Sequence, residues 1–96
     1  MIPSSRIQKI HFIGIGGAGM SGIAEILNGH GFKVSGSDAK ESDVTSYLSE
    51  IGVRLHIGHS SENINDVDLI VYSSAVKSDN VEIVEGKRKL IPDRKS

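Results

Sequence analysis

Residues 10–24 read IHFIGIGGAGMSGIA, and this stretch decides the fold. A short apolar run stops at Gly14, the glycines that follow fit the pattern G-x-G-x-x-G, and a helical repeat begins at Met20. The repeat places apolar residues at the i, i+3, i+4 and i+7 spacing of one helix face, at Met20, Ile23, Ala24 and Leu27. Because a strand, a glycine-rich turn and a helix in this order begin a βαβ unit, the stretch predicts a parallel α/β sheet.

The rest of the chain alternates between short apolar runs and helical repeats in the same way. Strands are expected over residues 7–15, 32–37, 53–57 and 67–72, with Leu90, Ile91 and Pro92 beginning a fifth. Helices are expected after Gly19, over residues 44–51 and over residues 80–89. The predicted fold class is therefore α/β, a Rossmann-like open parallel sheet of four to five strands with helices on both faces.

Several residues are expected to mark the helix ends. Ser42 or Asp43 is a candidate cap for the second helix. Asp79, followed three residues later by Glu82, resembles a capping arrangement for the third helix. Gly86 lies inside that helix at a cost of up to ~1 kcal/mol relative to alanine, so its end is expected to fray.

The length and charge of the chain exclude several classes of protein. The 96 residues carry 11 basic and 12 acidic side chains, so we expect one domain over residues 1–96 without a nucleic-acid or membrane partner. No apolar run approaches the ~20 residues that span a bilayer. The chain has no cysteine, which excludes disulfides and thiol catalysis, and no signal-peptide core, so we expect a cytoplasmic protein.

Motifs of catalytic chemistry are also absent from the sequence. The pattern G-x-x-x-x-G-K-[ST] does not occur, because the one Gly-Lys pair, Gly86-Lys87, continues with Arg88. No nucleophile, base and orienting group stand at a recognised spacing. We therefore expect a domain that binds a ligand without catalytic residues or a metal site of its own.

The glycine loop from Gly14 to Gly19 is the strongest candidate for the binding site. In loops of this pattern the three glycines, here Gly14, Gly16 and Gly19, permit a tight turn, close approach to a pyrophosphate, and helix packing. Free N–H groups and the helix dipole then favour a bound anion. Gly17 adds a position without a side chain, and Ser21 places a hydroxyl in the first turn. The alternative interpretation is a glycine-rich turn with no ligand.

Asp38 ends the second expected strand in the sequence Gly36-Ser37-Asp38, nineteen residues after Gly19. In dinucleotide-binding domains an acidic residue about 20 positions beyond the glycine loop accepts hydrogen bonds from a ribose hydroxyl. This spacing predicts a ribose contact at Asp38. The alternative is that Ser37 and Asp38 only turn the chain or cap the segment that follows.

Polar residues also follow the third and fourth expected strands, at Gly58-His59-Ser60 and Ser73-Ser74-Ala75. Because the carboxyl ends of parallel strands share one edge, all four segments are expected to meet in one crevice. His59 is as much a candidate donor to a phosphate or base carbonyl as it is a solvated loop residue. His11 and His56 fall inside strands, where hydrogen-bonded structural histidines are expected.

Residues 11–25, HFIGIGGAGMSGIAE, resemble the opening of the UDP-N-acetylmuramate:L-alanine ligases, a branch of the Mur ligase family. The Met-Ser pair after the last glycine is specific, because a general dinucleotide fingerprint does not require it. The resemblance covers residues 7–89 and continues through VSGSD at 34–38, GHSSEN at 58–63, SSAV at 73–76 and Asp79-Asn80.

This resemblance implies a Rossmann-like N-terminal domain that holds the UDP part of UDP-N-acetylmuramate in bacterial peptidoglycan biosynthesis, on which cell-wall formation, cell shape and division depend. It implies that residues 16–21 lie against the pyrophosphate and that the other loops surround the uridine. The expected contact residues are Gly14, Gly16, Gly17, Ala18, Gly19, Met20, Ser21, Ser37, Asp38, His59, Ser73, Ser74 and Ala75.

The same resemblance implies that the chain is a fragment of a longer multidomain ligase, inactive alone. Later domains would bind ATP, Mg²⁺ and L-alanine, and ATP would activate the muramoyl carboxylate as an acyl phosphate that the alanine amine attacks. The tail departs from the family, which continues through an arginine-containing segment into the ATP-binding domain where this chain has Asp93-Arg94-Lys95-Ser96.

Three alternatives remain open from the sequence. The first is an NAD- or FAD-binding domain of an oxidoreductase, because the glycine pattern and the spacing to Asp38 suit any ligand with a pyrophosphate and a ribose. The second is the related ligase that returns recycled murein peptides to UDP-N-acetylmuramate. The third is a non-catalytic regulatory or interaction domain that keeps the fold without the ligand.

Overall fold

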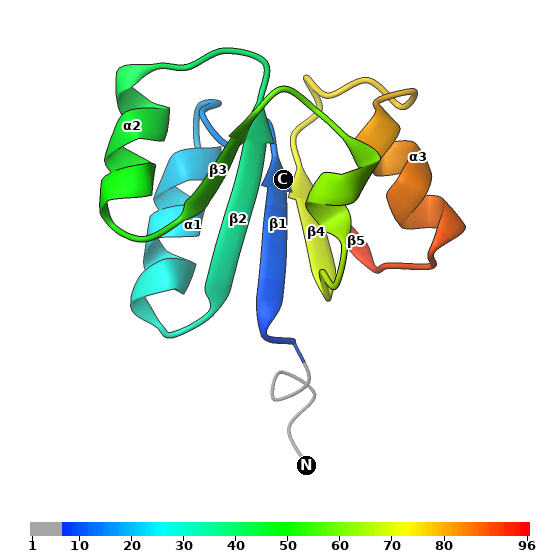
Figure 1. Cartoon of the computed structure of the whole chain (residues 1–96), viewed down its shortest axis with the longest axis horizontal. Helices are drawn as coiled ribbons and strands as arrows, with labels where there is room; N and C mark the ends of the chain where they lie inside the picture. Colours follow the sequence, from blue (N-terminus) through cyan, green and yellow to red (C-terminus); the bar gives the residue numbers. More distant parts are fainter. Residues whose placement is uncertain (1–6) are drawn as a thin grey trace.

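A computed structural model describes residues 7–96, which form a single five-stranded parallel sheet with helices on both faces (Figure 1). The strand order is β3-β2-β1-β4-β5, and every neighbouring pair is parallel. The elements in chain order are β1 (Lys9–Ile13), α1 (Met20–Gly29), β2 (Lys33–Asp38), α2 (Asp43–Glu50), β3 (Arg54–Ile57), the 3₁₀ helix η2 (Ser61–Ile64), β4 (Leu69–Tyr72), α3 (Val81–Arg88) and β5 (Asp93–Lys95). The predicted fold class is confirmed.

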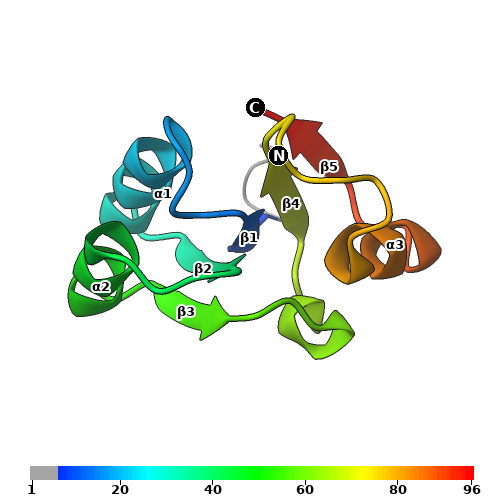
Figure 2. The same ribbon diagram turned by 90° about the horizontal axis from the view of Figure 1, so that it is seen from above.

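The two faces of the sheet carry separate apolar cores. Figure 2 shows α1 and α2 on one face, and η2 and α3 on the other. Alternate residues of the central strand β1 serve the two sides, so Phe12 packs with the α1 and α2 residues, while Ile13 packs with Ile64, Ile70 and Ile83. His11 shares the α3 side with Ile13, and this places a polar ring inside the second core.

One of the two helix caps expected from the sequence is found. Ser42 caps α2 in a capping box, in which its hydroxyl accepts from Thr45 N–H while Thr45 Oγ1 accepts from Ser42 N–H. Gly31, with φ +93°, follows the end of α1. The cap predicted at Asp79 is wrong, because Asn80 occupies that position and its Oδ1 accepts from Glu82 N–H at 2.9 Å. This frees the Glu82 side chain for another role.

The fifth strand begins later than the sequence indicated. Leu90 is 87% exposed and has a φ of +58°, so it forms a turn between α3 and the sheet. The strand itself is Asp93–Lys95, which pairs with β4 from Ile70 to Tyr72. The expectation that Leu90, Ile91 and Pro92 start the strand is therefore wrong, because the strand begins just after them, at Asp93.

Two glycines inside regular elements lie at close approaches to other parts of the chain. Gly36 is buried in β2, and a methyl group there would lie 2.7 Å from Ile15 Cβ. Gly86 is buried in α3, where a methyl group would lie 2.5 Å from Ile70 Cδ1 of β4. The expected fraying around Gly86 is not seen, since α3 continues to Arg88 and Gly86 forms the point where the helix approaches the sheet.

We expect Gly36→Ala to lower the free energy of unfolding by about 1–3 kcal/mol, because Ile15 Cβ belongs to a buried backbone segment that has no room to move. Gly22→Ala is the matched control. A methyl group there meets nothing within 4 Å, so this change should raise the stability by up to ~1 kcal/mol. Urea denaturation measures both, and equal stabilities of the two variants would contradict the packing assignment.

Candidate functional site

Four loops meet at the carboxyl edge of the sheet, as the sequence predicted (Figure 2). Ser37 O of β2 accepts from both Gly14 N–H and Ile15 N–H, at 2.8 and 3.0 Å, and so joins the glycine loop to the second strand. The segment after β4 comes close as well, because a methyl group at Gly14 would lie 3.4 Å from Val76 Cγ2. His59, after β3, reaches Ser37 through a 2.9 Å hydrogen bond.

The glycine loop presents backbone N–H groups at the start of α1. Gly14 and Gly19 adopt φ values of +76° and +80°, which other residues rarely tolerate. Gly17 N–H donates to Gly14 O, whereas the N–H groups of Ala18 and Gly19 have no hydrogen-bond partner within residues 7–96. Both residues are exposed, and α1 has no side-chain cap. The loop therefore offers unpaired donors and the positive end of a helix dipole to an anion.

One glycine role expected from the sequence is wrong, and a second glycine has a neighbour within its own chain. A methyl group at Gly19 would meet nothing within 4 Å, so this glycine serves the positive φ and not helix packing. A methyl group at Gly16 would lie 2.9 Å from Asp38 Oδ2, the same oxygen that accepts from Gly16 N–H at 2.9 Å. A side chain at position 16 would therefore displace the Asp38 carboxylate, and the expected approach of Gly16 to a pyrophosphate stays a prediction.

Asp38 braces the glycine loop from the end of β2. Its Oδ2 holds Gly16 N–H, and its Oδ1 accepts from Lys40 N–H at 3.3 Å. The Asp38 carboxylate thus turns the chain, as the second interpretation held, and the ribose contact stays a prediction. Each oxygen keeps a further lone pair for a ligand hydroxyl.

The remaining predicted contact residues divide by exposure. Ser74 and Ala75 are exposed at the edge, Ser73 Oγ accepts from Ala75 N–H at 3.3 Å, and Ser21 is half-buried. The side chains of Met20 and Ser37 lie beneath the surface, 1% and 0% exposed. A ligand at this surface would therefore not meet the side chains of those two residues.

Glu82 is the residue that the sequence reasoning missed. Its side chain, fully buried, points from the first turn of α3 toward the sheet, where four donors surround it. Oε1 lies 2.7 Å from both His11 Nε2 and Ser37 Oγ, and Oε2 accepts from Ser60 N–H at 3.0 Å and Asn63 Nδ2 at 2.8 Å. Two donors for each oxygen satisfy a carboxylate.

The surroundings of Glu82 decide its charge. Burial alone would raise the pKa of the Glu82 carboxyl, but the hydrogen bonds from His11, Ser37 and Asn63 outweigh burial and lower the pKa from 4.5 to about 2. The predicted structural role of His11 is confirmed, because its Nδ1 also lies 2.7 Å from Ser35 Oγ. His56 is half-buried, and its side chain makes no hydrogen bond within residues 7–96, so the hydrogen-bonded role expected for it is not found.

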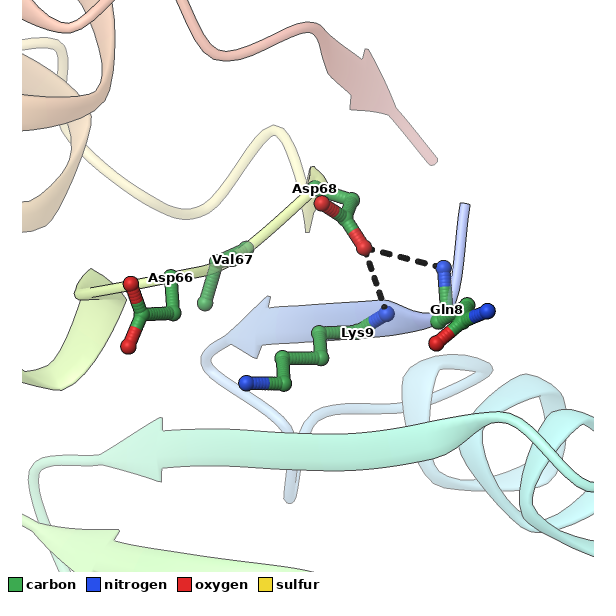
Figure 3. Close-up of a pocket in the computed structure, with 5 residues that line it drawn as sticks. All are labelled: Gln8, Lys9, Asp66, Val67 and Asp68. Atoms are coloured by element: carbon green, nitrogen blue, oxygen red, sulfur yellow. Dashed lines mark hydrogen bonds between the residues drawn. The ribbon is translucent and has the colours of Figure 1, made fainter. Parts of the chain in front are cut away.

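The opposite edge of the sheet holds a hollow lined by Gln8, Lys9, Asp66, Val67 and Asp68 (Figure 3). There Asp68 Oδ2 accepts from the N–H groups of Gln8 and Lys9, both at 2.9 Å, and these bonds lower the pKa of the Asp68 carboxyl. The arrangement ties the start of β4 to the start of β1. It lies at the amino ends of the strands, away from the four loops of the carboxyl edge.

A parallel sheet with a glycine loop at its carboxyl edge belongs to the Rossmann-like α/β class. Residues 9–96 match the family model described as "Mur ligase family, catalytic domain", and the chain belongs to the Mur ligase family. Among residues 7–96, none of the helices has the length and apolar character needed to cross a membrane.

Known relatives agree with this assignment. The UDP-N-acetylmuramate–L-alanine ligase of Geobacter sulfurreducens is 58% identical over 87 residues, which cover 91% of this chain and 19% of that protein. The solved UDP-N-acetylmuramate-alanine ligase of Thermotoga maritima matches with a TM-score of 0.87 and 40% identity, over 91% of this chain and 20% of that one. The chain thus spans about a fifth of the length of these relatives.

A ligase with a different named substrate is more distant. The UDP-N-acetylmuramate:L-alanyl-gamma-D-glutamyl-meso-diaminopimelate ligase of Neisseria meningitides matches with a TM-score of 0.77 and 31% identity, over 93% of this chain and 28% of that one. The resemblance to the L-alanine ligases is confirmed, and the ligase interpretation is favoured over the oxidoreductase.

We expect the stability of the domain to fall as the pH drops from about 4.5 toward about 2. Over this interval the unfolded chain takes up the Glu82 proton first, and the folded protein takes it up only near the lower end. The lowered pKa contributes stability on the order of 3 kcal/mol, fully present above the unfolded pKa and lost below the folded one. Carbon-13 NMR of the Glu82 carboxyl measures the pKa directly.

The control for this pH dependence is Glu82→Gln, which has no carboxyl to titrate. Its unfolding free energy should start about 1–3 kcal/mol lower at neutral pH, because the amide nitrogen faces other donors, and should vary less with acid. A Glu82 carboxyl that titrates at its ordinary 4.5 in the folded protein would show that the network does not hold the charge.

Proposed function

We propose that this chain is the UDP-N-acetylmuramate-binding domain of a cytoplasmic, ATP-dependent ligase that joins L-alanine to that nucleotide sugar in peptidoglycan synthesis. One observation carries the proposal: the exposed, unpaired N–H groups of Ala18 and Gly19 lie at the start of α1, on the edge where the other three loops meet. The 58% identity to an L-alanine ligase over the same residues supports this choice of ligand.

In this proposal the pyrophosphate lies against the glycine loop, where the Ala18 and Gly19 amide groups donate to it and the α1 dipole favours its charge. The uridine lies toward Asp38, His59 and the Ser73–Ala75 segment. Asp38 holds the loop through Gly16 and offers its remaining lone pairs to a ribose hydroxyl.

ATP and Mg²⁺ do not fit the residues described. Residues 7–96 contain no group of three His, Asp or Glu side chains that could hold a metal ion. The glycine loop also lacks the lysine and hydroxyl residue of a P-loop, since Gly19 is followed by Met20. We therefore assign ATP, Mg²⁺ and L-alanine to other parts of the ligase and propose that the present chain alone forms no amide bond.

The proposal is tested by amide NMR titration of the chain with UDP-N-acetylmuramate and, separately, with NAD. We expect saturable shifts at residues 14–21, Asp38, His59 and residues 73–75 with the UDP sugar. A response to NAD alone would restore the oxidoreductase interpretation. Silence with both ligands would contradict the proposal and favour a domain that no longer binds nucleotides.

A charge placed in the loop gives a matched pair of variants. We expect Ala18→Asp to weaken UDP-N-acetylmuramate binding by roughly tenfold or more, because its carboxylate faces the pyrophosphate, whereas the neutral Ala18→Asn of equal size has a small effect. Ala18 is exposed, so neither change disturbs the core. Isothermal titration calorimetry compares the two, and equal affinities would remove the phosphate from this loop.

A further inference from the structure

One hydroxyl group connects the His59 imidazole to the buried carboxylate of Glu82. Ser37 Oγ lies 2.9 Å from His59 Nδ1 and 2.7 Å from Glu82 Oε1. Ser37 is fully buried on β2, so water does not compete for these contacts. His59 is 25% exposed and belongs to the loop edge described above. The serine therefore links a core residue to a surface residue of the candidate site.

The proton of the Ser37 hydroxyl can serve only one of these two neighbours. A carboxylate can only accept hydrogen bonds, so the contact of Ser37 Oγ with Glu82 Oε1 needs the serine proton. The other oxygen, Oε2, receives its N–H groups from Ser60 and Asn63. Ser37 therefore donates to Glu82 Oε1, and its oxygen lone pair is left for the histidine. It follows that His59 Nδ1 carries a proton and donates it to Ser37. Glu82 Oε2, 3.6 Å from the same nitrogen, favours that proton too.

The other nitrogen of the His59 ring faces away from this network. The two nitrogens of an imidazole point in diverging directions, and His59 Nε2 makes no hydrogen bond to any of residues 7–96. In a neutral ring with its proton on Nδ1, Nε2 carries a lone pair and accepts a hydrogen bond.

We propose that Glu82 and Ser37 are positioning residues that keep a proton on His59 Nδ1, so that in the neutral ring Nε2 accepts a hydrogen bond from the bound nucleotide. This reverses the donor role that the sequence indicated for His59. The group that it recognises is an N–H or O–H, either the imide N–H of the uracil base or a ribose hydroxyl. In naming this ligand, the inference rests on the proposed function.

The tautomer is tested without any ligand by long-range ¹H–¹⁵N NMR of the histidine rings, above the pH range in which histidine titrates. We expect the Nδ1–H form of His59 in the native chain. In Ser37→Ala the Nδ1 proton loses its acceptor, so the ring should shift toward the Nε2–H form. Observation of the Nε2–H form in the native chain, or an unchanged tautomer in Ser37→Ala, would overturn the proposal.

The chain offers a closely matched control in Ser35→Ala. Ser35 also lies on β2, and its Oγ also contacts a histidine nitrogen of the same network, His11 Nδ1, at 2.7 Å. It does not touch His59. A merely structural effect of removing a β2 hydroxyl that contacts a histidine would act in both variants, whereas the proposal requires that only Ser37→Ala changes the His59 tautomer. A similar change in Ser35→Ala would contradict the relay through Ser37.

The recognised group is identified with three probes: UDP, UDP with N3 of the base methylated, and 2′-deoxy-UDP. If Nε2 accepts from the base, the methylated probe should bind the native chain roughly tenfold more weakly than UDP does. If Nε2 accepts from the ribose, 2′-deoxy-UDP should show that roughly tenfold loss of affinity instead. In Ser37→Ala that difference should shrink to roughly twofold. Full affinity of both analogues, or a loss that persists in Ser37→Ala, would overturn the proposal.

The two measurements separate this inference from the proposed function. UDP that fails to bind the native chain would refute the proposed function and with it the ligand contact, although the Nδ1–H tautomer would still be found. UDP that binds while His59 holds the Nε2–H form would leave the proposed function in place and refute the positioning roles of Ser37 and Glu82.

Discussion

The buried carboxylate of Glu82 is the interaction on which the arrangement of the whole domain depends. It leaves the first turn of α3 and accepts from β1, β2, the residue before η2 and η2 itself, through His11, Ser37, Ser60 and Asn63. A buried charge is tolerated only when its lone pairs accept hydrogen bonds, so the network stabilises the fold only when all four donors are in position. This requirement fixes α3 and η2 on the sheet more specifically than the apolar contacts of Ile64 and Ile83 do.

Ser37 joins this network to the candidate site. Its carbonyl oxygen receives two N–H groups of the glycine loop, and its hydroxyl lies between Glu82 and His59. Asp38, the next residue, holds Gly16 and so fixes the middle of the same loop. The end of β2 thus holds the glycine loop through the Ser37 carbonyl and the Asp38 carboxylate. It holds His59 through the Ser37 hydroxyl. Both parts of the site are therefore held from the carboxyl end of β2.

The sequence predicts what depends on local pattern and misses what depends on packing. Apolar periodicity and glycine positions located four strands and three helices, because each is a property of neighbouring residues. The sequence could not show that the Glu82 side chain points into the core, because an acidic residue in the first turn of a helix is equally typical of a capping residue. The roles of Gly36 and Gly86 depend on Ile15 and Ile70 side chains of other elements, and Leu90 reads as a strand residue until its positive φ is known.

The sequence separation within the Glu82 network has a consequence for the order of folding. β1, α1, β2, α2 and β3 are consecutive, so their contacts close short loops. Glu82 is 71 residues from His11 and 45 from Ser37, so its hydrogen bonds close only after the chain has passed β4 and returned to the sheet. We therefore expect the contacts of α3 with β1 and β2 to form later than its contacts with the neighbouring η2 and β4. Any local opening that moves α3 off the sheet also breaks the hydrogen bond from Ser37 to Glu82. The position of the His59 ring therefore depends on α3 being docked.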